Sequence, residues 1–363
     1  MTTVRDVYNA IDAIAPFSSA LDWDNCGLLV GDPSRPVEKV LAALDVTPEV
    51  VAEAVRSGAQ LIISHHPVIF HPLKALTPGQ PAFLAAAAGV AVISAHTNYD
   101  MAPAGVNKAL ADALGLTGLQ PLAVEASRPF CTIAVFVPRE YQQAVYAAMA
   151  GAGAGRLGNY SGCAFSSDGE GVFVPEAGAH PFLGTVGAPE QAAECRLQML
   201  VPPDRLSAVI AAMRAAHPYE EPAFDVFENH AAMQETTLGL VGALPREMSE
   251  AEFAAAIADA LHITPRYNPG ARRIRHAAVC GGAGGNYAAQ AARHPLRPQA
   301  MVTGEARHHE FLQAAAAGLT LYDAAHYNTE APALSQLLGQ LRTALPEVQF
   351  LRAESYDGTL ICG

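Results

Sequence analysis

Short apolar runs alternate with helical patterns along the first third of the chain, and this alternation limits the possible folds. Three runs have the continuous apolar character of buried strands: VEKVLAALDV, AQLIISH and VAVISAH. Between the first two, Thr47 is placed to cap a helix, Pro48 to begin it and Gly58 to end it. Parallel neighbours need a crossover connection such as a helix. We therefore predict an α/β fold with a mostly parallel sheet.

The pattern changes between residues 126 and 234. A strand and a helix come first, and the segments GCAFSS and EGVFVPE then predict a hairpin that turns at Asp168-Gly169. A strand, a helix and the strand PAFDVFEN follow. This β-α-β-β-β-α-β order predicts a ferredoxin-like unit.

From residue 235 to residue 363 the α/β alternation resumes, with the strands TLGLVGAL, RIRHAAVC, QAMVTGE and LTLYDAAH. The simplest organisation is one α/β domain, made of residues 1–125 and 235–363, that is interrupted by an inserted module at residues 126–234. Three domains in series are the alternative. We favour the insertion because both flanks contribute residues to one predicted site.

Side chains that can bind metals follow four of the predicted strands. In chain order they are His65 and His66, His96 and Asp100, Glu305, and His326 and Glu330. Parallel α/β sheets bind ligands at the carboxyl ends of their strands, so we expect these residues to converge. If a helix begins near His326, then Glu330 lies one turn away on the same face. Imidazole and carboxylate ligands suit zinc, ferrous iron or manganese.

The tandem histidines His65 and His66 directly precede Pro67. Neighbouring side chains of a strand point to opposite faces, so we expect each histidine to serve a different ion of a close pair. Ions about 3.5–4 Å apart are a known arrangement for activating water. Pro67 lacks a backbone donor and ends the strand pairing. Two histidines, Asp100, His326 and Glu330 cannot saturate two ions, which leaves open positions as in a catalytic site.

Other residues near these motifs have structural interpretations. His96 alone is as well explained as a hydrogen-bonded structural histidine. The pair His308-His309 lies within a helical pattern, and we predict that it is on the surface or beside the ligands. The loop CGGAGGN lacks a phosphate-binding motif, so we predict a close-packed turn beside the site.

The segment LDWDNCG, residues 21–27, has two interpretations. Asp22, Asp24 and Asn25 can orient the ligands. The alternative is a turn that the single tryptophan, Trp23, anchors.

The composition excludes several functions. The net charge of −13 opposes binding to a nucleic-acid backbone or to an anionic membrane. No stretch reaches the roughly 18 apolar residues of a membrane span, and the N-terminus lacks the apolar core of a signal peptide. The cysteines are scattered without a C-x-x-C motif, which predicts buried thiols in a reducing cytoplasm. They are Cys26, Cys131, Cys163, Cys195, Cys280 and Cys362.

Seven segments resemble the signature segments of the NIF-three-like family, whose members are also labelled GTP cyclohydrolase 1 type 2 homologues. In the flanks these are LDWDNCGLLVGDP, LIISHHPVIFHPLKAL, AHTNYD, VTGEARHHEFL and DAAHYNTE. In the middle, GAGAGRLGNYSGCAFSSDGEGVF and AHPYEEPAFDV resemble the additional PII- or CutA-like domain of the longer members. The resemblance covers essentially the whole chain in the right order.

This resemblance implies an α/β domain with a dinuclear centre, and thus two divalent metal ions per subunit (Zn, Fe or Mn). The implied ligands are His65, His66, Asp100, His326 and Glu330, with Glu330 bridging the ions. The family also implies a toroidal homohexamer, a dimer of trimers whose metal sites face an interior cavity that the inserts cap. Shorter members can lack the HH of ARHHEF, so His308 and His309 are not carried over as ligands. His96 and Glu305 remain the candidates for proton transfer.

Two functions follow from these patterns. The first is a metal-dependent hydrolase of the GTP cyclohydrolase 1 type 2 kind, acting on a nucleotide or another small phosphorylated or heterocyclic substrate. The second is a non-enzymatic metal-binding or regulatory scaffold with effector binding at the inserted domain. DNA binding is a third and more distant reading, which the acidic charge opposes.

Overall fold

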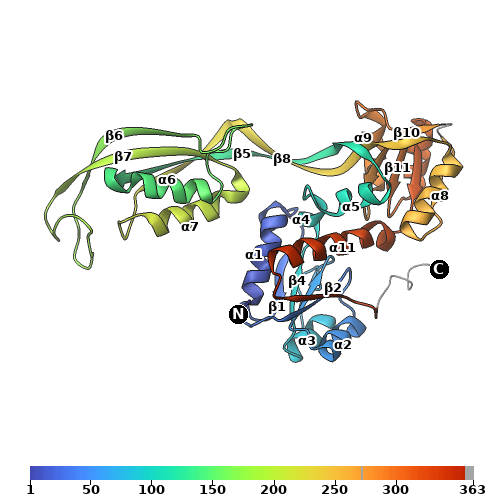
Figure 1. Cartoon of the computed structure of the whole chain (residues 1–363), viewed down its shortest axis with the longest axis horizontal. Coiled ribbons are helices and arrows are strands. Elements are labelled where there is room, and N and C mark those ends of the chain that lie inside the picture. The colour runs from blue at the N-terminus through green and yellow to red at the C-terminus, as the bar shows by residue number, and fades with distance from the viewer. Residues whose placement is uncertain (271–272, 356–363) are drawn as a thin grey trace. The chain divides into compact units, whose positions relative to one another are not determined.

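The computed structural model describes residues 1–270 and 273–355, and it divides into two compact units. The first unit comprises residues 1–125 with 236–363, and the second comprises residues 126–235. Two long strands carry the chain from one unit to the other (Figure 1), namely β5 (Thr117–Pro138) and β8 (Phe224–Met248).

The first unit contains a five-stranded sheet in the order β1-β4-β3-β2-β13. The three pairs β4–β3, β3–β2 and β2–β13 are parallel, whereas β1 runs antiparallel to β4. The bounds are β1 Gly27–Val30, β2 Lys39–Ala43, β3 Leu61–Ser64, β4 Ala91–Ser94 and β13 Gln349–Arg352. Thr47, Pro48 and Gly58 act as predicted: the Thr47 side chain caps α2 (Pro48–Ser57), and Gly58 ends it at φ 70°.

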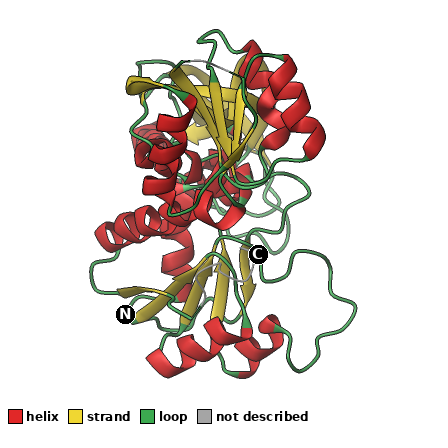
Figure 2. Ribbon diagram, turned by 90° about the vertical axis from the view of Figure 1, so that its right-hand side faces the viewer, coloured by secondary structure: helices red, strands yellow, loops and turns green. Residues whose placement is uncertain are grey.

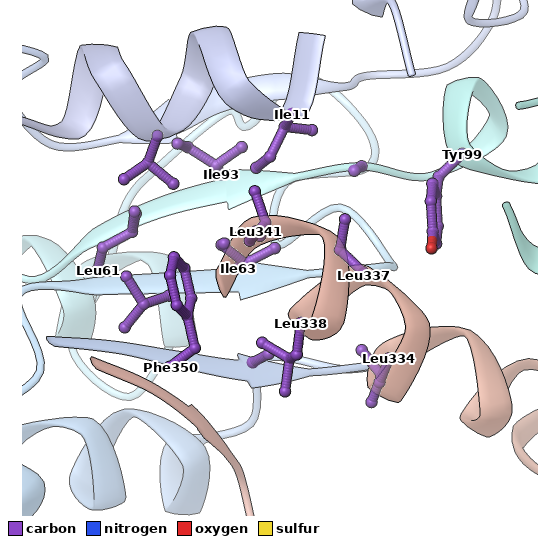
Figure 3. Close-up of a cluster of buried hydrophobic side chains, with 14 of the residues drawn as sticks. Ile11, Leu61, Ile63, Ile93, Tyr99, Leu334, Leu337, Leu338, Leu341 and Phe350 are labelled. Atoms are coloured by element: carbon purple, nitrogen blue, oxygen red, sulfur yellow. The ribbon is translucent and has the colours of Figure 1, made fainter. Parts of the chain in front are cut away.

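Helices cover both faces of this sheet (Figure 2). Helices α2 and α3 (Pro81–Ala87) pack on one face, and α1 (Val4–Ile14) and α11 (His326–Ala344) pack on the other. Figure 3 shows Ile63 and Ile93 of the sheet beside Leu337 and Leu341 of α11. Burying each of these side chains contributes roughly 1.5–3 kcal/mol, so the packing fixes where α11 begins relative to the strand ends.

A second sheet in the first unit has the order β8-β10-β11-β12-β9. The pairs β10–β11 and β11–β12 are parallel, while β8–β10 and β12–β9 are antiparallel. Its further strands are β9 Arg266–Tyr267, β10 Ile274–Cys280, β11 Ala300–Thr303 and β12 Thr320–Asp323. Its helices are α5 Val106–Ala113, α8 Glu250–Leu261, α9 Ala288–Arg293 and α10 His308–Ala316.

The predicted α/β class is confirmed, and the first sheet is mostly parallel as predicted, with three parallel pairs out of four. The unit has two sheets, and the second contains as many antiparallel as parallel pairs. Alternating strand and helix signals show that each strand is buried. They do not determine which strands become neighbours.

The second unit has the order β5-α6-β6-β7-α7-β8, the element order of ferredoxin-like units. Its strands lie in the order β6-β7-β5-β8, and β7 runs antiparallel to both neighbours for which the register is known. The remaining bounds are α6 Gln142–Gly151, β6 Ala164–Phe173, β7 Glu190–Val201 and α7 Leu206–Ala216. Short helical turns occupy Phe17–Ser19, Thr97–Asp100 (α4), Arg139–Tyr141, Pro203–Arg205 and Gly285–Tyr287.

Two local predictions for the second unit are wrong. The hairpin expected at Asp168-Gly169 is the middle of the continuous strand β6, which pairs with β7 along its whole length. The segments PAFDVFEN and TLGLVGAL, expected as separate strands, both belong to β8. In both cases the pairing of the strand satisfies the backbone hydrogen bonds and overrides the local turn preference.

Five cysteines are free thiols: Cys131, Cys195 and Cys280 are buried, and Cys26 and Cys163 are half-buried. Cys362 lies outside the described residues. Among the helices that the structure describes, none is both long and apolar enough to cross a membrane.

Candidate metal centre

The five predicted ligands come together from three segments of the first unit. His65 and His66 directly follow β3, and Asp100 is the last residue of the short helix α4. His326 is the first residue of α11, as predicted, and Glu330 lies one turn later. The Nε2 atom of His326 and the Oε1 atom of Glu330 are 3.1 Å apart.

The side chains form two groups that share Glu330. In one group, His65 Nε2 lies 3.5 Å from Asp100 Oδ1 and 3.6 Å from Glu330 Oε1. In the other, His66 Nε2 lies 3.2 Å from His326 Nε2 and 3.1 Å from Glu330 Oε2. Tetrahedral coordination at about 2.0–2.1 Å separates neighbouring ligand atoms by roughly 3.3 Å. The spacing in both groups therefore fits a metal ion.

A third group relates the tandem histidines to His96. Potential ligand atoms of His65, His66 and His96 all lie within 4.8 Å of one another. Strand β3 ends at Ser64, so both tandem histidines lie beyond the regular strand. The argument that adjacent histidines point to opposite faces therefore does not apply here, and the two side chains approach the same region.

Three buried polar atoms in this cluster have no hydrogen-bond partner. They are His65 Nε2, Asp100 Oδ1 and Glu330 Oε2. Burying a polar atom without a partner is costly, and such atoms are rare in folded proteins. A divalent cation satisfies all three at once, because imidazole nitrogen and carboxylate oxygen are its ordinary ligands. The residues present therefore fit a metal ion.

The outer nitrogen of each histidine is fixed by an acceptor. The Nδ1 atom of His65 bonds to the carbonyl oxygen of Ala95 at 2.9 Å, and that of His66 bonds to Asp45 Oδ1 at 2.8 Å. These bonds turn both Nε2 atoms toward the cluster. Asp45 was not predicted from the sequence. It follows β2 at its carboxyl end, the same signal that identified the other residues.

The electrostatics of the cluster favour positive charge. Burial disfavours protonated His66, but the neighbouring carboxylates of Asp45 and Glu330 raise its pKa to about 10. Burial likewise opposes protonation of His326, yet Glu330 raises the pKa of this histidine to about 9. Burial works against the Glu330 carboxylate too, but the surrounding imidazoles hold its pKa well below the usual range. Burial raises the pKa of Asp100. Positive charge in the cluster, on the imidazoles or on a bound metal ion, therefore compensates the negative charge of the buried carboxylates.

Asp24 orients His96. Its Oδ1 atom accepts a hydrogen bond from His96 Nδ1 at 2.9 Å. Its Oδ2 atom accepts from the backbone and side chain of Thr97, at 3.0 and 2.6 Å, and from Cys26 Sγ at 2.9 Å. Despite burial, these donors hold the pKa of Asp24 far below its usual value. The segment also forms the turn of the alternative interpretation, because the Asp24 amide donates to the carbonyl oxygen of Leu21 at 2.9 Å, but Trp23 is 60% exposed and does not anchor this turn in the core.

Comparison with known proteins identifies the family of this chain. The family model described as "Duf34/NIF3 (NGG1p interacting factor 3)" matches residues 2–357. The chain belongs to the Duf34/NIF3 family. The resemblance recognised in the sequence motifs is thereby confirmed.

Relatives of this Duf34/NIF3 protein match most of its length. A Bacillus subtilis protein named "GTP cyclohydrolase 1 type 2 homolog" is 39% identical over 329 residues, which cover 89% of this chain and 88% of the relative. A Mycobacterium tuberculosis protein with the same name is 37% identical over 355 residues, covering 94% and 91%. The crystal structure of a Bacillus cereus protein related to NIF3 superposes with a TM-score of 0.79 at 34% identity and covers 97% of each chain.

The glycine-rich loop of this Duf34/NIF3 protein packs against the cluster. Gly282 has φ 62°, and a Cβ atom there would lie 2.4 Å from Glu330 Oε1. A Cβ atom on Gly304 would lie 2.5 Å from the hydroxyl of Thr329. The prediction of a close-packed turn at CGGAGGN is confirmed.

Glu305 and the second histidine pair lie outside the two ligand groups. The Glu305 side chain is 61% exposed, and its Oε1 atom accepts a hydrogen bond from His326 Nδ1 at 2.7 Å. This contact is on the side of the imidazole opposite the cluster. His308 and His309 are exposed in the first turn of α10, so the prediction that they are surface residues is confirmed.

Ala325, just before the ligand candidate His326, has a strained backbone. Its φ of 59° with ψ of 146° is a conformation that side chains with a Cβ rarely adopt. The Oδ1 atom of Asp323 accepts a hydrogen bond from the Ala325 amide at 3.2 Å and supports this geometry. Nothing in the sequence signals the strain, because alanine is an ordinary residue at the start of a helix.

Proposed function

We propose that this Duf34/NIF3 protein is a metal-dependent hydrolase, similar to a GTP cyclohydrolase 1 type 2, with two divalent ions (Zn, Fe or Mn) per subunit. The observation that carries the proposal is the sharing of Glu330 between the His65–Asp100 group and the His66–His326 group. One bridging carboxylate with separate ligands on either side is a suitable arrangement for two neighbouring ions. The names of the relatives support the reaction class.

Bound divalent ions would lower the pKa of water toward ~7 and stabilise negative charge that develops on the substrate. The protein residues supply the remaining functions. His65, His66, Asp100 and His326 would hold the ions, and their few donor atoms leave room for substrate. His96 donates a hydrogen bond from Nδ1 to Asp24, so Nε2 of His96 remains free to exchange a proton with a reacting group.

A cavity of about 590 Å³ beside His326 offers a place for substrate. Arg307 and Glu305 line it, together with Arg266 and Asp323, which form an ion pair with each other. Guanidinium groups bind phosphate or carboxylate oxygens well. This lining supports a nucleotide or another small phosphorylated substrate. Glu305 would orient His326, or exchange protons at the rim of the cavity.

The proposal is tested with purified protein loaded separately with Zn²⁺, Mn²⁺ or Fe²⁺ and assayed against GTP and a nucleotide panel. We expect turnover that His65→Ala and Glu330→Ala abolish. His308→Ala is the matched control, because it removes an exposed imidazole outside the cluster. Turnover that persists in both ligand variants, or none with any metal, rejects the hydrolase.

We propose that residues 126–234 are a PII- or CutA-like module inserted into one domain made of residues 1–125 and 235–363. The grouping of residues 1–125 with 236–363 and the β-α-β-β-α-β order of the second unit support this. The resemblance of the motifs supports a homohexamer, which mass photometry measures directly. Five free thiols support a cytoplasmic location.

The second candidate function is a non-enzymatic metal-binding or regulatory scaffold that binds an effector at the inserted module. A cavity of about 580 Å³ in the second unit favours it. Metabolite binding there that is unaffected by His65→Ala, together with no turnover of the nucleotide panel, would favour the scaffold over the hydrolase.

A further inference from the structure

The cavity of the second unit lies on the face of its sheet that helices do not cover. Along β7, Cys195 and Leu197 pack into the core beneath α6 and α7. Glu194 and Arg196 alternate with them and line the cavity on the other face. The loop after β6 contributes Phe182, and the segment after α7 contributes Tyr219.

Four aromatic residues line this cavity, and three of them, Phe173, Phe182 and Tyr219, lie next to one another. The ring centroid of Tyr219 lies 5.9 Å from that of Phe173 and 6.1 Å from that of Phe182. The interplanar angles of 57° and 43° show that the rings are tilted rather than stacked. Inclined rings around a common space can present their electron-rich faces to a cation, which binds within about 6 Å of a ring centroid.

Glu194 brings a buried carboxylate to the same cavity. The residue is only 7% exposed, and its carboxylate occupies space above Gly171, where a Cβ atom would lie 2.3 Å from Oε2. Among the described residues, no arginine, lysine or histidine forms an ion pair with Glu194. Arg196, its neighbour on the same strand face, instead donates from Nη1 to Gln198 Oε1 at 2.6 Å. A buried carboxylate without a counter-charge is costly, so a cationic ligand would be bound favourably.

The nearest histidine does not supply that charge. His217 donates from Nε2 to the carbonyl oxygen of Phe136 at 2.9 Å, and its Nδ1 accepts from the amide of Tyr219 at 3.1 Å. A ring that donates at one nitrogen and accepts at the other is neutral. The hydroxyl of Tyr219 is buried beside the Glu194 carboxylate, and burial together with this carboxylate raises the pKa of the hydroxyl.

Most of the charged residues around the cavity are acidic. Five carboxylate residues line it, against the single guanidinium of Arg196: Asp168, Glu170, Glu194, Glu220 and Glu221. Three of these carboxylates already have partners in the protein: Asp168 pairs with Arg139 at 2.9 Å, Glu170 accepts from Gln191, and Glu220 accepts from the His180 amide. Glu194 is the buried one, which makes it the principal partner for a ligand.

We propose that this cavity is a binding site for a small organic cation: a substituted ammonium group held between Glu194 and the rings of Phe173, Phe182 and Tyr219. The volume of about 580 Å³ is that of an ordinary small-molecule site. All the residues that form it belong to the second unit, so binding does not depend on the metal centre or on the proposed hydrolase activity.

The test uses the full chain and a pair of molecules with one shape. Choline and 3,3-dimethylbutan-1-ol differ in charge but hardly in size, and benzyltrimethylammonium is a larger cation with a ring. Binding is measured by isothermal titration and by saturation-transfer NMR. We expect both cations to bind at least about tenfold more tightly than the neutral alcohol. Glu194→Gln should remove that preference, whereas Glu228→Gln, an exposed carboxylate outside the cavity, should preserve it.

Further variants separate the possible outcomes. Phe182 is largely exposed, so Phe182→Ala should fold normally and weaken cation binding. Glu330→Ala should leave cation binding unchanged. The proposal is overturned if neither cation binds better than the alcohol, or if Glu194→Gln binds the cations as well as the natural protein does. It is also overturned if Phe182→Ala changes the oligomer mass and no cation binds, because the cavity then belongs to an interface between copies.

Discussion

The Nε2 atoms of His66 and His326 lie 3.2 Å apart, although 260 residues separate the two histidines in the chain. His66 follows β3 of the first sheet, and His326 begins α11, which packs across the same sheet. The cluster therefore forms only when the start and the end of the chain fold together. A metal held there stabilises the folded state, because it has little affinity for the separated segments.

The first prediction concerns metal content. Because Glu330 belongs to both ligand groups, we expect Glu330→Ala to lose both ions. His65→Ala and His326→Ala each affect one group, and we expect each to retain about one ion of the pair. Elemental analysis of purified, metal-loaded protein measures the ratio, with His308→Ala as the control that keeps full occupancy. Equal loss in all three ligand variants would show that the two groups do not bind ions separately.

The second prediction concerns Asp24, which accepts five hydrogen bonds, from His96, Cys26, the Asn25 amide, and the amide and hydroxyl of Thr97. Asp24→Asn replaces one acceptor oxygen by a donor group, so at least one buried donor loses its partner. Each such loss costs about 1–3 kcal/mol, and we expect a decrease of that size in the free energy of unfolding. Urea denaturation measures it. Asp112→Asn, at an exposed pair with Lys108, should change stability by less than about 0.5 kcal/mol.

The sequence predicts those parts of the structure that depend on local chemistry. The helix that Thr47 caps and Gly58 ends is formed by contacts within a dozen residues, so its signals are sufficient. His326 and Glu330 share a helix, and their spacing alone places them on one face. The strand-end rule also identifies His65, His66 and Asp100, and it would have identified Asp45 had it been applied to β2.

What the sequence did not predict depends on distant partners. Asp168-Gly169 has the composition of a turn, but the facing strand β7 holds it in an extended strand. The division into two sheets results from which strands pair. The sequence does not indicate this pairing, because every strand is similarly apolar. Two further features arise only once β12 and α11 are joined at a fixed angle. They are the contact of Glu305 with the outer nitrogen of His326 and the backbone strain at Ala325.

The third prediction concerns that strain. Ala325 adopts φ 59° and ψ 146°, which costs of the order of 1–3 kcal/mol for a residue with a Cβ atom. Ala325→Gly relieves it and loses about 0.4–1 kcal/mol through the greater freedom of the unfolded chain. We expect metal-free protein to become more stable by up to about 2 kcal/mol in urea denaturation. Ala331→Gly, within the same helix, should instead destabilise by about 1 kcal/mol. A destabilised Ala325→Gly variant would show that the strain is not released.

The fourth prediction concerns the pH dependence of stability at the start of α8. Glu252 accepts hydrogen bonds from the backbone and hydroxyl of Ser249, at 2.8 and 2.9 Å, and from Arg246 at 2.9 Å. These donors lower the pKa of Glu252 from 4.5 to about 2. A carboxyl with a lower pKa in the folded state contributes stability above its unfolded value, and that stability disappears as the pH falls through the folded value.

Glu252→Gln should therefore be less stable than the natural protein at neutral pH, and the difference should decrease between pH 4.5 and about pH 2. Urea denaturation at a series of pH values measures the difference in unfolding free energy between the two proteins. Ser249→Ala removes one of the three donors and should reduce the pH-dependent part without abolishing it. If the difference between Glu252→Gln and the natural protein stays constant below pH 4.5, the carboxyl of Glu252 does not titrate with a lowered pKa.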